Sequence, residues 1–330
     1  MTEVTAGIHR IELPITMPGS TLAYVNTYLI QGDNGYLLVD TGWNTDASLD
    51  SLQNQLAEIG SDIRDITQIL VTHVHPDHYG MAGKIMQQSG ASLATHDIEK
   101  GFIESRYINM DKLLKETAHW LSMHGAPPDN LADMRDASLN ITQYVVPTNP
   151  DITLHGGETI TTGKFTFQVL WTPGHSSGHI CLHEPDKKVL VSGDHILPTI
   201  TPNISKHPQS VENPLGKYLD SLNDLRKLDI QLILPGHGNP FTQLKQRIDE
   251  LIQHHEQRTS EILTTLRNHA KTVYEIAQEI SWKDYTNWQD MPFSHQRLAM
   301  FETLAHLELM TINGQTGKIS RDSIIYYQQT

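Results

Sequence analysis

The chain has 330 residues and a formal net charge of −14 at pH 7, which fits one large acidic domain with room for an appendage. The acidic balance disfavours a long nucleic acid or an anionic membrane surface as a partner. The single cysteine, Cys181, excludes an intrachain disulfide framework.

The N-terminal region shows no targeting segment and leads into a predicted hairpin. It lacks the basic stretch and apolar run of a signal peptide, and no segment approaches the roughly 18 continuous apolar residues of a membrane span, so we expect a cytoplasmic protein. Residues 24–30 and 36–39 are predicted strands joined by turn-forming residues, which argues against an all-parallel sheet. Asp40 follows the second strand in the turn-forming sequence Asp-Thr-Gly.

Four metal-capable side chains follow the next predicted strand. Residues 66–71 form an apolar run typical of a buried strand, and His73, His75, Asp77 and His78 come directly after it. Imidazoles and carboxylates suit a divalent cation such as zinc. A lone histidine after a strand is usually a packed or capping residue, but four such groups within six positions indicate two adjacent cations.

Residues 97–146 interrupt the strand pattern with helical spacing, for example over 112–123. This helical insertion either lies over the site and excludes water or is an added structural element of the scaffold without a role at the site. Tyr79, beside the histidine cluster, either lines a substrate pocket as a phenol donor or packs in the interior.

Three further predicted strands also end in glycine followed by a metal-capable residue. Residues 165–171 lead to His175, residues 188–192 lead to Asp194, and residues 231–234 lead to His237. Four separate strand ends therefore deliver histidine or aspartate to one edge of a sheet. His195, next to Asp194, either polarises a substrate or forms a hydrogen bond to the backbone, and the second is the interpretation we favour.

The last part of the sequence changes character. Helical spacing over 247–268, 272–280 and 294–307 is followed by a predicted hairpin over 309–319 around Asn313-Gly314. This order resembles a winged-helix module. Residues 246–330 contain 8 basic and 11 acidic side chains, a net charge of −3, so we favour a packing, dimerisation or substrate-pocket role over DNA binding.

The run His73-Val-His75-Pro-Asp77-His78 matches the HxHxDH signature of the metallo-β-lactamase superfamily and resembles its glyoxalase II-like hydrolases. With the later motifs, the resemblance covers about three quarters of the chain. It implies an α/β fold, an αββα sandwich over 1–245 with the helical insertion at about 97–146, followed by a small winged-helix-like domain over 246–330. Some hydrolases of this superfamily, including a ribonuclease-like branch, carry such a module.

The resemblance also assigns residues to two divalent cations, with zinc expected and manganese or iron acceptable to the same donors. His179 is expected to pack behind the ligands, and Asp40 either supports them or only forms its turn. Asp77 and Asp194 are the expected catalytic carboxylates. The implied ligands are His73, His75 and His175 for the first cation, Asp77, His78 and His237 for the second, and Asp194 as the bridge.

The implied activity is metal-dependent hydrolysis, in which a hydroxide shared by the two cations attacks a small ester, thioester or lactone. The alternative is a phosphodiesterase, another phosphoester hydrolase or a ribonuclease-like enzyme on the same site. A protein in which the metal serves only structure or sensing is a third hypothesis, but seven ligands for two cations leave coordination open. We expect a small-molecule substrate, neither nucleic acid nor membrane as partner, and a homodimer through the C-terminal region. The C-terminal organisation differs from that of glutathione-binding relatives, so no glutathione specificity is inferred.

Overall fold

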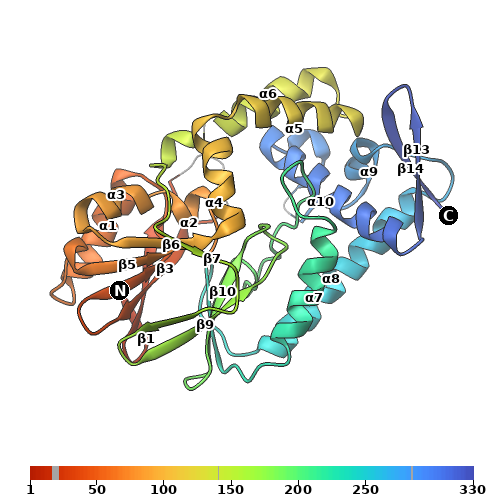
Figure 1. Ribbon diagram of the computed structural model, residues 1–330. Helices are drawn as coiled ribbons and strands as arrows, with labels where there is room; N and C mark the ends of the chain where they lie inside the picture. The colour runs from red at the N-terminus through yellow and green to blue at the C-terminus, as the bar shows by residue number, and fades with distance from the viewer. Residues whose placement is uncertain (17–21, 140, 284) are drawn as a thin grey trace.

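Two β-sheets stacked face to face form one side of the molecule, and the insertion and the C-terminal helices form the other (Figure 1). The computed structural model describes residues 1–16, 22–139, 141–283 and 285–330. Within these ranges the first sheet has seven strands in sequence order. Strands β1 to β4 pair antiparallel and strands β4 to β7 pair parallel, which confirms the hairpin of β3 and β4 and the mixed sheet. The strands are β1 (Thr2–Thr5), β2 (Ile8–Pro14), β3 (Tyr24–Gln31), β4 (Tyr36–Val39), β5 (Ile66–Leu70), β6 (Ser92–His96) and β7 (Ile152–Leu154).

The second sheet has five strands among the described residues, in the order β12-β11-β10-β9-β8. Its strands pair antiparallel except for β11 and β12, which run parallel. The parallel pair matters because it brings the carboxyl ends of both strands to the same edge of the sheet. The strands are β8 (Thr159–Thr162), β9 (Phe165–Trp171), β10 (Ile180–Glu184), β11 (Val189–Gly193) and β12 (Leu232–Pro235).

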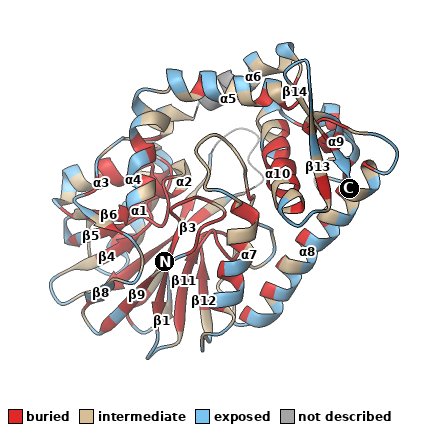
Figure 2. Cartoon of the chain, turned by 45° about the vertical axis from the view of Figure 1, so that its right-hand side comes forward, coloured by how far each residue is buried: buried red, intermediate tan, exposed pale blue. Residues whose placement is uncertain are grey.

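The inner faces of the two sheets pack on each other in one hydrophobic cluster. Strand β9 shows why, because Phe165, Phe167 and Val169 alternate with more exposed residues and point inward. They meet Tyr28 of β3 and Leu70 of β5 from the first sheet. All five of these side chains are almost completely buried, so this layer fixes the spacing of the sheets. Figure 2 shows that the strands of both sheets consist largely of buried residues.

Helices cover the outer face of each sheet, which confirms the predicted αββα sandwich. On the first sheet, α1 (Asp46–Ala57) buries Leu52 and Leu56, and α3 (Ala82–Ser89) buries Ile85. On the second sheet, α7 (Pro214–Leu225) and the first half of α8 (Leu244–Thr265) pack against the outward side chains of β10, β11 and β12. Short helical turns complete this part: a 3-10 turn at Ile63–Asp65 and α2 (Pro76–Tyr79).

The predicted insertion is helical, with several elements between β6 and β7. They are α4 (Asp97–Ile103), a π-helical turn at Glu104–Ile108, α5 (Asp111–Met123), α6 (Pro128–Leu139) and a 3-10 turn at Thr142–Tyr144. Helices α5 and α6 lie beside the C-terminal helices in both views (Figure 1, Figure 2). Leu121 of α5 and Ala126 after it belong to the same hydrophobic cluster as the C-terminal helices, so the two regions share one core.

The C-terminal region has the predicted order of three helices and a hairpin. The second half of α8 is followed by α9 (Val273–Glu279), a 3-10 turn at Trp288–Asp290 and α10 (Phe293–Ile312). The prediction of a hairpin over 309–319 is wrong. Helix α10 continues to Ile312, and Gly314, with φ +72°, ends the helix instead of forming the hairpin turn. The hairpin is β13 (Thr316–Arg321) and β14 (Ile324–Gln329), turning at Asp322 and Ser323, which both have positive φ. The winged-helix assignment stays a prediction.

Helix α8 belongs to both parts of the molecule. Leu244, Ile248 and Leu251 at its start pack in the cluster beneath the second sheet. Ile262, near its end, and Leu266 just beyond it pack in the cluster of the C-terminal helices. The predicted boundary between 245 and 246 therefore falls at the beginning of a helix that joins the two cores, and it stays a prediction. Among the described residues, no helix is both long and apolar enough to cross a membrane.

Candidate metal centre

The predicted ligand residues lie together at one edge of the sandwich because each follows the end of a strand. His73 and His75 follow β5, and Asp77 and His78 lie in the helical turn α2 that comes next. The later three follow strands of the second sheet: His175 comes after β9, Asp194 after β11 and His237 after β12. The parallel pairing of β11 with β12 places Asp194 and His237 at the same edge, as the sequence predicted.

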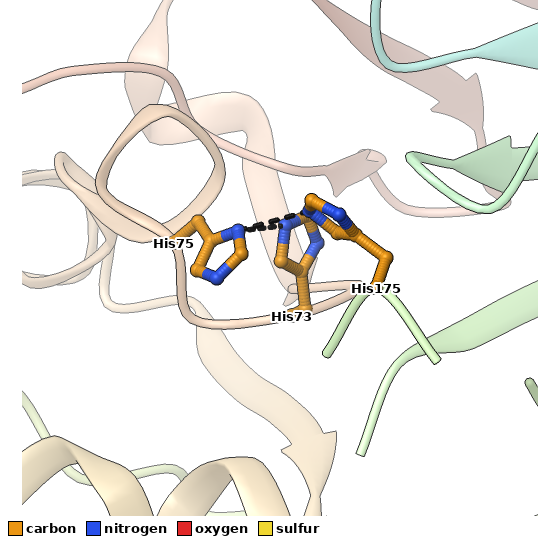
Figure 3. Close-up of side chains that lie close together, drawn as sticks. All are labelled: His73, His75 and His175. Atoms are coloured by element: carbon orange, nitrogen blue, oxygen red, sulfur yellow. Dashed lines mark hydrogen bonds between the residues drawn. The ribbon is translucent and has the colours of Figure 1, made fainter. Parts of the chain in front are cut away.

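Three imidazoles form a first group. Nε2 of His73 lies 2.9 Å from Nδ1 of His75, and Nε2 of His175 lies 3.0 Å from the same Nδ1 (Figure 3). The rings come from two segments 100 positions apart in sequence and point toward one another. Three nitrogen atoms facing one point are the donor set that a tetrahedral zinc site uses, with the remaining position open.

A second group contains Asp77, His78 and His237. Oδ2 of Asp77 lies 3.2 Å from Nε2 of His237 and 3.7 Å from Nε2 of His78. Asp194 lies between the two groups. Its Oδ1 is 3.4 Å from Nε2 of His78, and its Oδ2 is 3.5 Å from Nε2 of His237 and 3.7 Å from Nε2 of His175. One carboxylate therefore reaches both groups.

The donor atoms fit a pair of divalent cations. In each group the ligand atoms lie within 4.8 Å of one another. Nε2 of His78 and Oδ1 of Asp194 are buried without a hydrogen-bond partner among the described residues. A buried polar atom left unpaired costs roughly 1–3 kcal/mol, and coordination to a cation would remove that cost. Imidazole and carboxylate donors accept zinc, manganese or iron, so the residues do not select one metal.

In four of the imidazoles Nε2 faces the site and Nδ1 forms a hydrogen bond that fixes the orientation of the ring. Nδ1 of His175 lies 3.0 Å from the Asn203 carbonyl oxygen, and Nδ1 of His237 lies 3.1 Å from the Tyr24 carbonyl oxygen. A carbonyl can only accept, so each Nδ1 carries the proton and leaves the Nε2 lone pair for a metal. Nδ1 of His73 lies 3.1 Å from the Thr72 hydroxyl oxygen, and Nδ1 of His78 lies 2.8 Å from Asp40.

Asp40 supports the site as well as ending β4. Its side chain is buried, Oδ2 lies 2.8 Å from Nδ1 of His78, and Oδ1 accepts a hydrogen bond from the Thr72 backbone at 2.8 Å. Its φ of +63° is a conformation that few non-glycine residues adopt. The position therefore combines both interpretations that the sequence left open, a turn and a buried support for a ligand.

His179 lies behind the Asp194 carboxylate, as expected. Its Nε2 accepts a hydrogen bond from the Asp194 backbone N–H at 3.1 Å, and its Nδ1 is 2.8 Å from the Thr172 hydroxyl. Gly193 allows this approach because a Cβ at that position would lie 2.6 Å from Nε2 of His179. His179 thus positions the main chain that carries Asp194.

Glu99 is a supporting residue that the sequence analysis missed. It lies in α4, is fully buried, and accepts hydrogen bonds from the Val74 N–H at 2.9 Å and the Gly178 N–H at 2.8 Å. The Ser176 hydroxyl donates to the same carboxylate. Val74 lies between His73 and His75, and Ser176 follows His175, so one carboxylate joins the two loops that supply the first group. No motif or spacing marks this residue, because the contact exists only in the fold.

The electrostatics separate the two groups. Burial lowers the pKa of His73 and of His75 well below the usual value, so both imidazoles are neutral donors. Burial opposes ionisation of Asp77, but the His78 and His237 imidazoles outweigh it and lower the pKa of this carboxyl to about 2. Burial also opposes the charged form of His237, but Asp194 and Asp77 together raise its pKa to about 10. Positive charge is therefore favoured in the second group, where two carboxylates meet.

Tyr79 and His195, the predicted pocket residues, are both fully buried. The Tyr79 hydroxyl accepts a hydrogen bond from the Thr148 N–H at 2.6 Å and donates to the Thr148 carbonyl oxygen, so it is an interior residue. Nε2 of His195 lies 3.0 Å from the Ser221 hydroxyl rather than from a backbone atom, which corrects the favoured interpretation. The pocket prediction for both residues therefore has no support in the structure.

Comparisons with known proteins agree with this geometry. A family model described as the Metallo-beta-lactamase superfamily matches residues 20–237. The chain is 26% identical over 313 residues to the probable metallo-hydrolase YqjP of Bacillus subtilis (strain 168), a match that covers 92% of this chain and 93% of that protein.

Two solved structures are similar over nearly the whole chain. A metallo-beta-lactamase family protein from Thermus thermophilus matches with a TM-score of 0.85 and 30% identity, covering 99% of this chain and 100% of that one. A beta-lactamase domain protein from Burkholderia ambifaria matches with a TM-score of 0.79 and 26% identity, covering 100% of this chain and 94% of that one. The likeness therefore includes the insertion and the C-terminal helices.

Proposed function

The chain belongs to the metallo-β-lactamase superfamily and is a metal-dependent hydrolase, and from that premise we propose that it holds two divalent cations and cleaves a small ester, thioester or lactone. The observation that supports this most strongly is the position of Asp194. Its Oδ1 lies 3.4 Å from Nε2 of His78 in the second group, and its Oδ2 lies between the two groups, 3.5 Å from Nε2 of His237 and 3.7 Å from Nε2 of His175. A carboxylate placed in this way can hold two cations a few Å apart and offset their repulsion.

In this proposal the first cation is held by His73, His75 and His175, and the second by Asp77, His78 and His237. When bound, such a pair would lower the pKa of a shared water from about 15.7 toward 7 and polarise the acyl oxygen of a substrate. Zinc is the cation we propose, and manganese or iron is compatible with the same donors.

We propose that substrate approaches the site from the side of Asp77. The Asp77 side chain is 18% exposed and that of His175 is 11% exposed, whereas those of His78 and His237 are 0% and 3% exposed. Asp77 therefore lies where substrate and solvent meet the site, and we propose that its carboxylate also orients the attacking hydroxide. His78 and His237 lie on the buried side of the site.

A cysteine nucleophile is not an alternative here. Cys181 is fully buried in β10, and burial raises the pKa of its thiol to about 12. The thiolate, which is the reactive form, is therefore scarce near neutral pH. Hydrolysis through activated water needs no such nucleophile.

The test combines metal analysis with a substrate panel. We expect about two equivalents of metal per chain and turnover of p-nitrophenyl esters, thioesters or lactones but not of a p-nitrophenyl phosphodiester. Turnover of the phosphodiester alone would favour the phosphodiesterase alternative instead. A metal-free protein without activity on any of these substrates would contradict both.

Ligand variants sharpen the test. His75→Ala and His175→Ala should each lose bound metal and reduce kcat/KM by at least about 100-fold, beyond the 10–100-fold typical of an outer partner. His119→Ala is the matched control, because His119 lies exposed on α5. Retention of both metal and activity in the His75 and His175 variants would show that the ligand assignment is wrong.

A further inference from the structure

The outer partner of His175 is connected to the C-terminal helices. Nδ1 of His175 donates to the Asn203 carbonyl oxygen at 3.0 Å, and the Asn203 side-chain amide donates to Oε2 of Glu302 at 2.9 Å. Glu302 lies in α10. A chain of two hydrogen bonds therefore joins a member of the first ligand group to a residue 99 positions away from Asn203 in sequence.

The loop around Asn203 is held to α10 at two more points. The Lys206 N–H donates to the Phe301 carbonyl oxygen at 3.0 Å, and Nζ of Lys206 lies 3.1 Å from Oε1 of Glu308. With the bond between Asn203 and Glu302, three contacts attach one short loop to this helix. These attachments fix the position of the loop relative to the helix.

Glu302 itself is fixed from a third element. Its side chain is 11% exposed, and its Oε1 lies 3.7 Å from Nε of Arg258 in α8. Arg258 is also buried, donates to Oε2 of Glu261 at 2.8 Å, and donates to the Ser281 carbonyl oxygen. Helices α8 and α10 together therefore set the position of the acceptor that Asn203 uses.

The outer partners of the second group come from other elements. His78 contacts Asp40 after β4, and His237 contacts the Tyr24 carbonyl oxygen of β3. Both partners belong to the first sheet. Among the described residues, His175 is thus the ligand candidate whose outer partner is tied by its side chain to the C-terminal helices.

We propose that Asn203 and Glu302 are positioning residues through which α8 and α10 orient His175, so that the C-terminal helices set the affinity of the first cation site more strongly than that of the second. This inference rests on the proposed pair of cation sites. It gives the C-terminal region a role in the metal centre. Because linked equilibria are reciprocal, a cation bound to the first group should in turn stabilise the docking of α10.

The test compares metal binding in five full-length proteins, each stripped of metal and titrated with zinc in competition with a chelator. Asn203→Ala and Glu302→Leu remove the side-chain bond, whereas Glu302→Gln keeps an oxygen that can accept it. Glu261→Gln is the matched control, because Glu261 also pairs with Arg258 but makes no bond to Asn203. Wild type completes the set.

We expect wild type, Glu302→Gln and Glu261→Gln to bind two zinc ions alike. In Asn203→Ala and Glu302→Leu one of the two affinities should fall by about 10–100-fold and the other should change much less. Hydrogen exchange gives a readout that does not depend on activity: zinc should slow exchange in α10 of wild type but not of Asn203→Ala. The thermal midpoint of each metal-free variant shows whether it is folded.

The remaining outcomes all contradict the inference, and one of them also contradicts the proposed function. Wild type that binds fewer than two ions contradicts the proposed function and this inference together. Wild type and Asn203→Ala that bind two ions with the same affinities, or an Asn203→Ala variant that loses both affinities equally, contradict the inference alone.

Discussion

A buried carboxylate without a metal-ligand role can decide the geometry of a metal site. Glu99 uses both oxygens to hold the Val74 and Gly178 N–H groups, and these belong to the two loops that carry His73, His75 and His175. A carboxylate is suited to this task because both of its oxygens accept. An amide of the same shape has one acceptor and one donor group.

This asymmetry predicts the effect of Glu99→Gln. The amide must face one backbone N–H with its own NH₂ group, so we expect a loss of roughly 1–3 kcal/mol in the free energy of unfolding, the usual cost of a buried group left unpaired. Urea unfolding of the metal-free protein measures it, and a zinc titration should show weakened binding in the first group. Glu104→Gln, an exposed neighbour, is the control. Equal stability and equal zinc affinity in both variants would contradict the role of Glu99.

The sequence predicted the candidate ligands and two of their supporting residues, Asp40 and His179, but not the other supporting residues. His73, His75, Asp77 and His78 were visible because they lie within six positions, and His175, Asp194 and His237 because each follows a strand and a glycine. Glu99, Asn203 and Glu302 carry no such mark. Their contacts span 25, 28 and 99 positions respectively, and hydrogen bonds over such separations depend on packing that sequence spacing does not encode.

At the scale of elements, the existence and type of each element were easier to predict than the ends of the longest helices. Strands β4 and β9 have their expected bounds, whereas α8 spans Leu244–Thr265 instead of 247–268 and α10 spans Phe293–Ile312 instead of 294–307. A long amphipathic pattern indicates a helix but does not fix the residue at which it ends. The C-terminal hairpin was misplaced because Asn313-Gly314 is also a common end of a helix. Local turn chemistry did not distinguish the two, and the packing of Met310 in the C-terminal cluster extends α10 past the expected end.

The insertion and the C-terminal helices form one packing unit, which predicts the effect of Leu121→Ala. Leu121 of α5 is 2% exposed within the cluster that contains Ile262 and Leu304. Truncating a buried leucine usually costs about 2–5 kcal/mol. Hydrogen exchange should therefore accelerate in α9 and α10 as well as in α5.

A matched truncation in another cluster distinguishes faster exchange within a shared core from a general loss of stability. Leu56→Ala removes the same side chain from α1, which packs in the cluster over the first sheet. It should accelerate exchange in the first sheet and its helices more than in α10. If Leu121→Ala changes exchange in α5 alone, the insertion and the C-terminal helices do not share a cooperative core.

For the molecule as a whole, buried neutral histidines set the response to acid. Burial lowers the pKa of His124 to about 4 and the pKa values of His207 and His306 to about 3. The unfolded chain has ordinary histidines with pKa values of about 6.5. Because the folded pKa is the lower one, the unfolded state binds more protons below pH 6.5, and stability falls as the pH falls.

His124 gives this effect a test away from the metal centre. It lies just after α5, its ring stacks on Tyr327 of β14, and Lys318 of β13 adds a positive charge that also disfavours its protonation. A pKa of about 4 in the folded state implies that His124 leaves the free energy of unfolding intact above pH 6.5 and lowers it by about 2 kcal/mol at pH 5.

Metal-free wild type should therefore lose about 2 kcal/mol more in the free energy of unfolding than His124→Gln does between pH 8 and pH 5. Urea unfolding at the two pH values measures the difference, and His119→Gln, at an exposed position of α5, is the control that should behave like wild type. The same pH dependence in all three proteins would mean that burial beside Tyr327 and Lys318 does not keep His124 neutral.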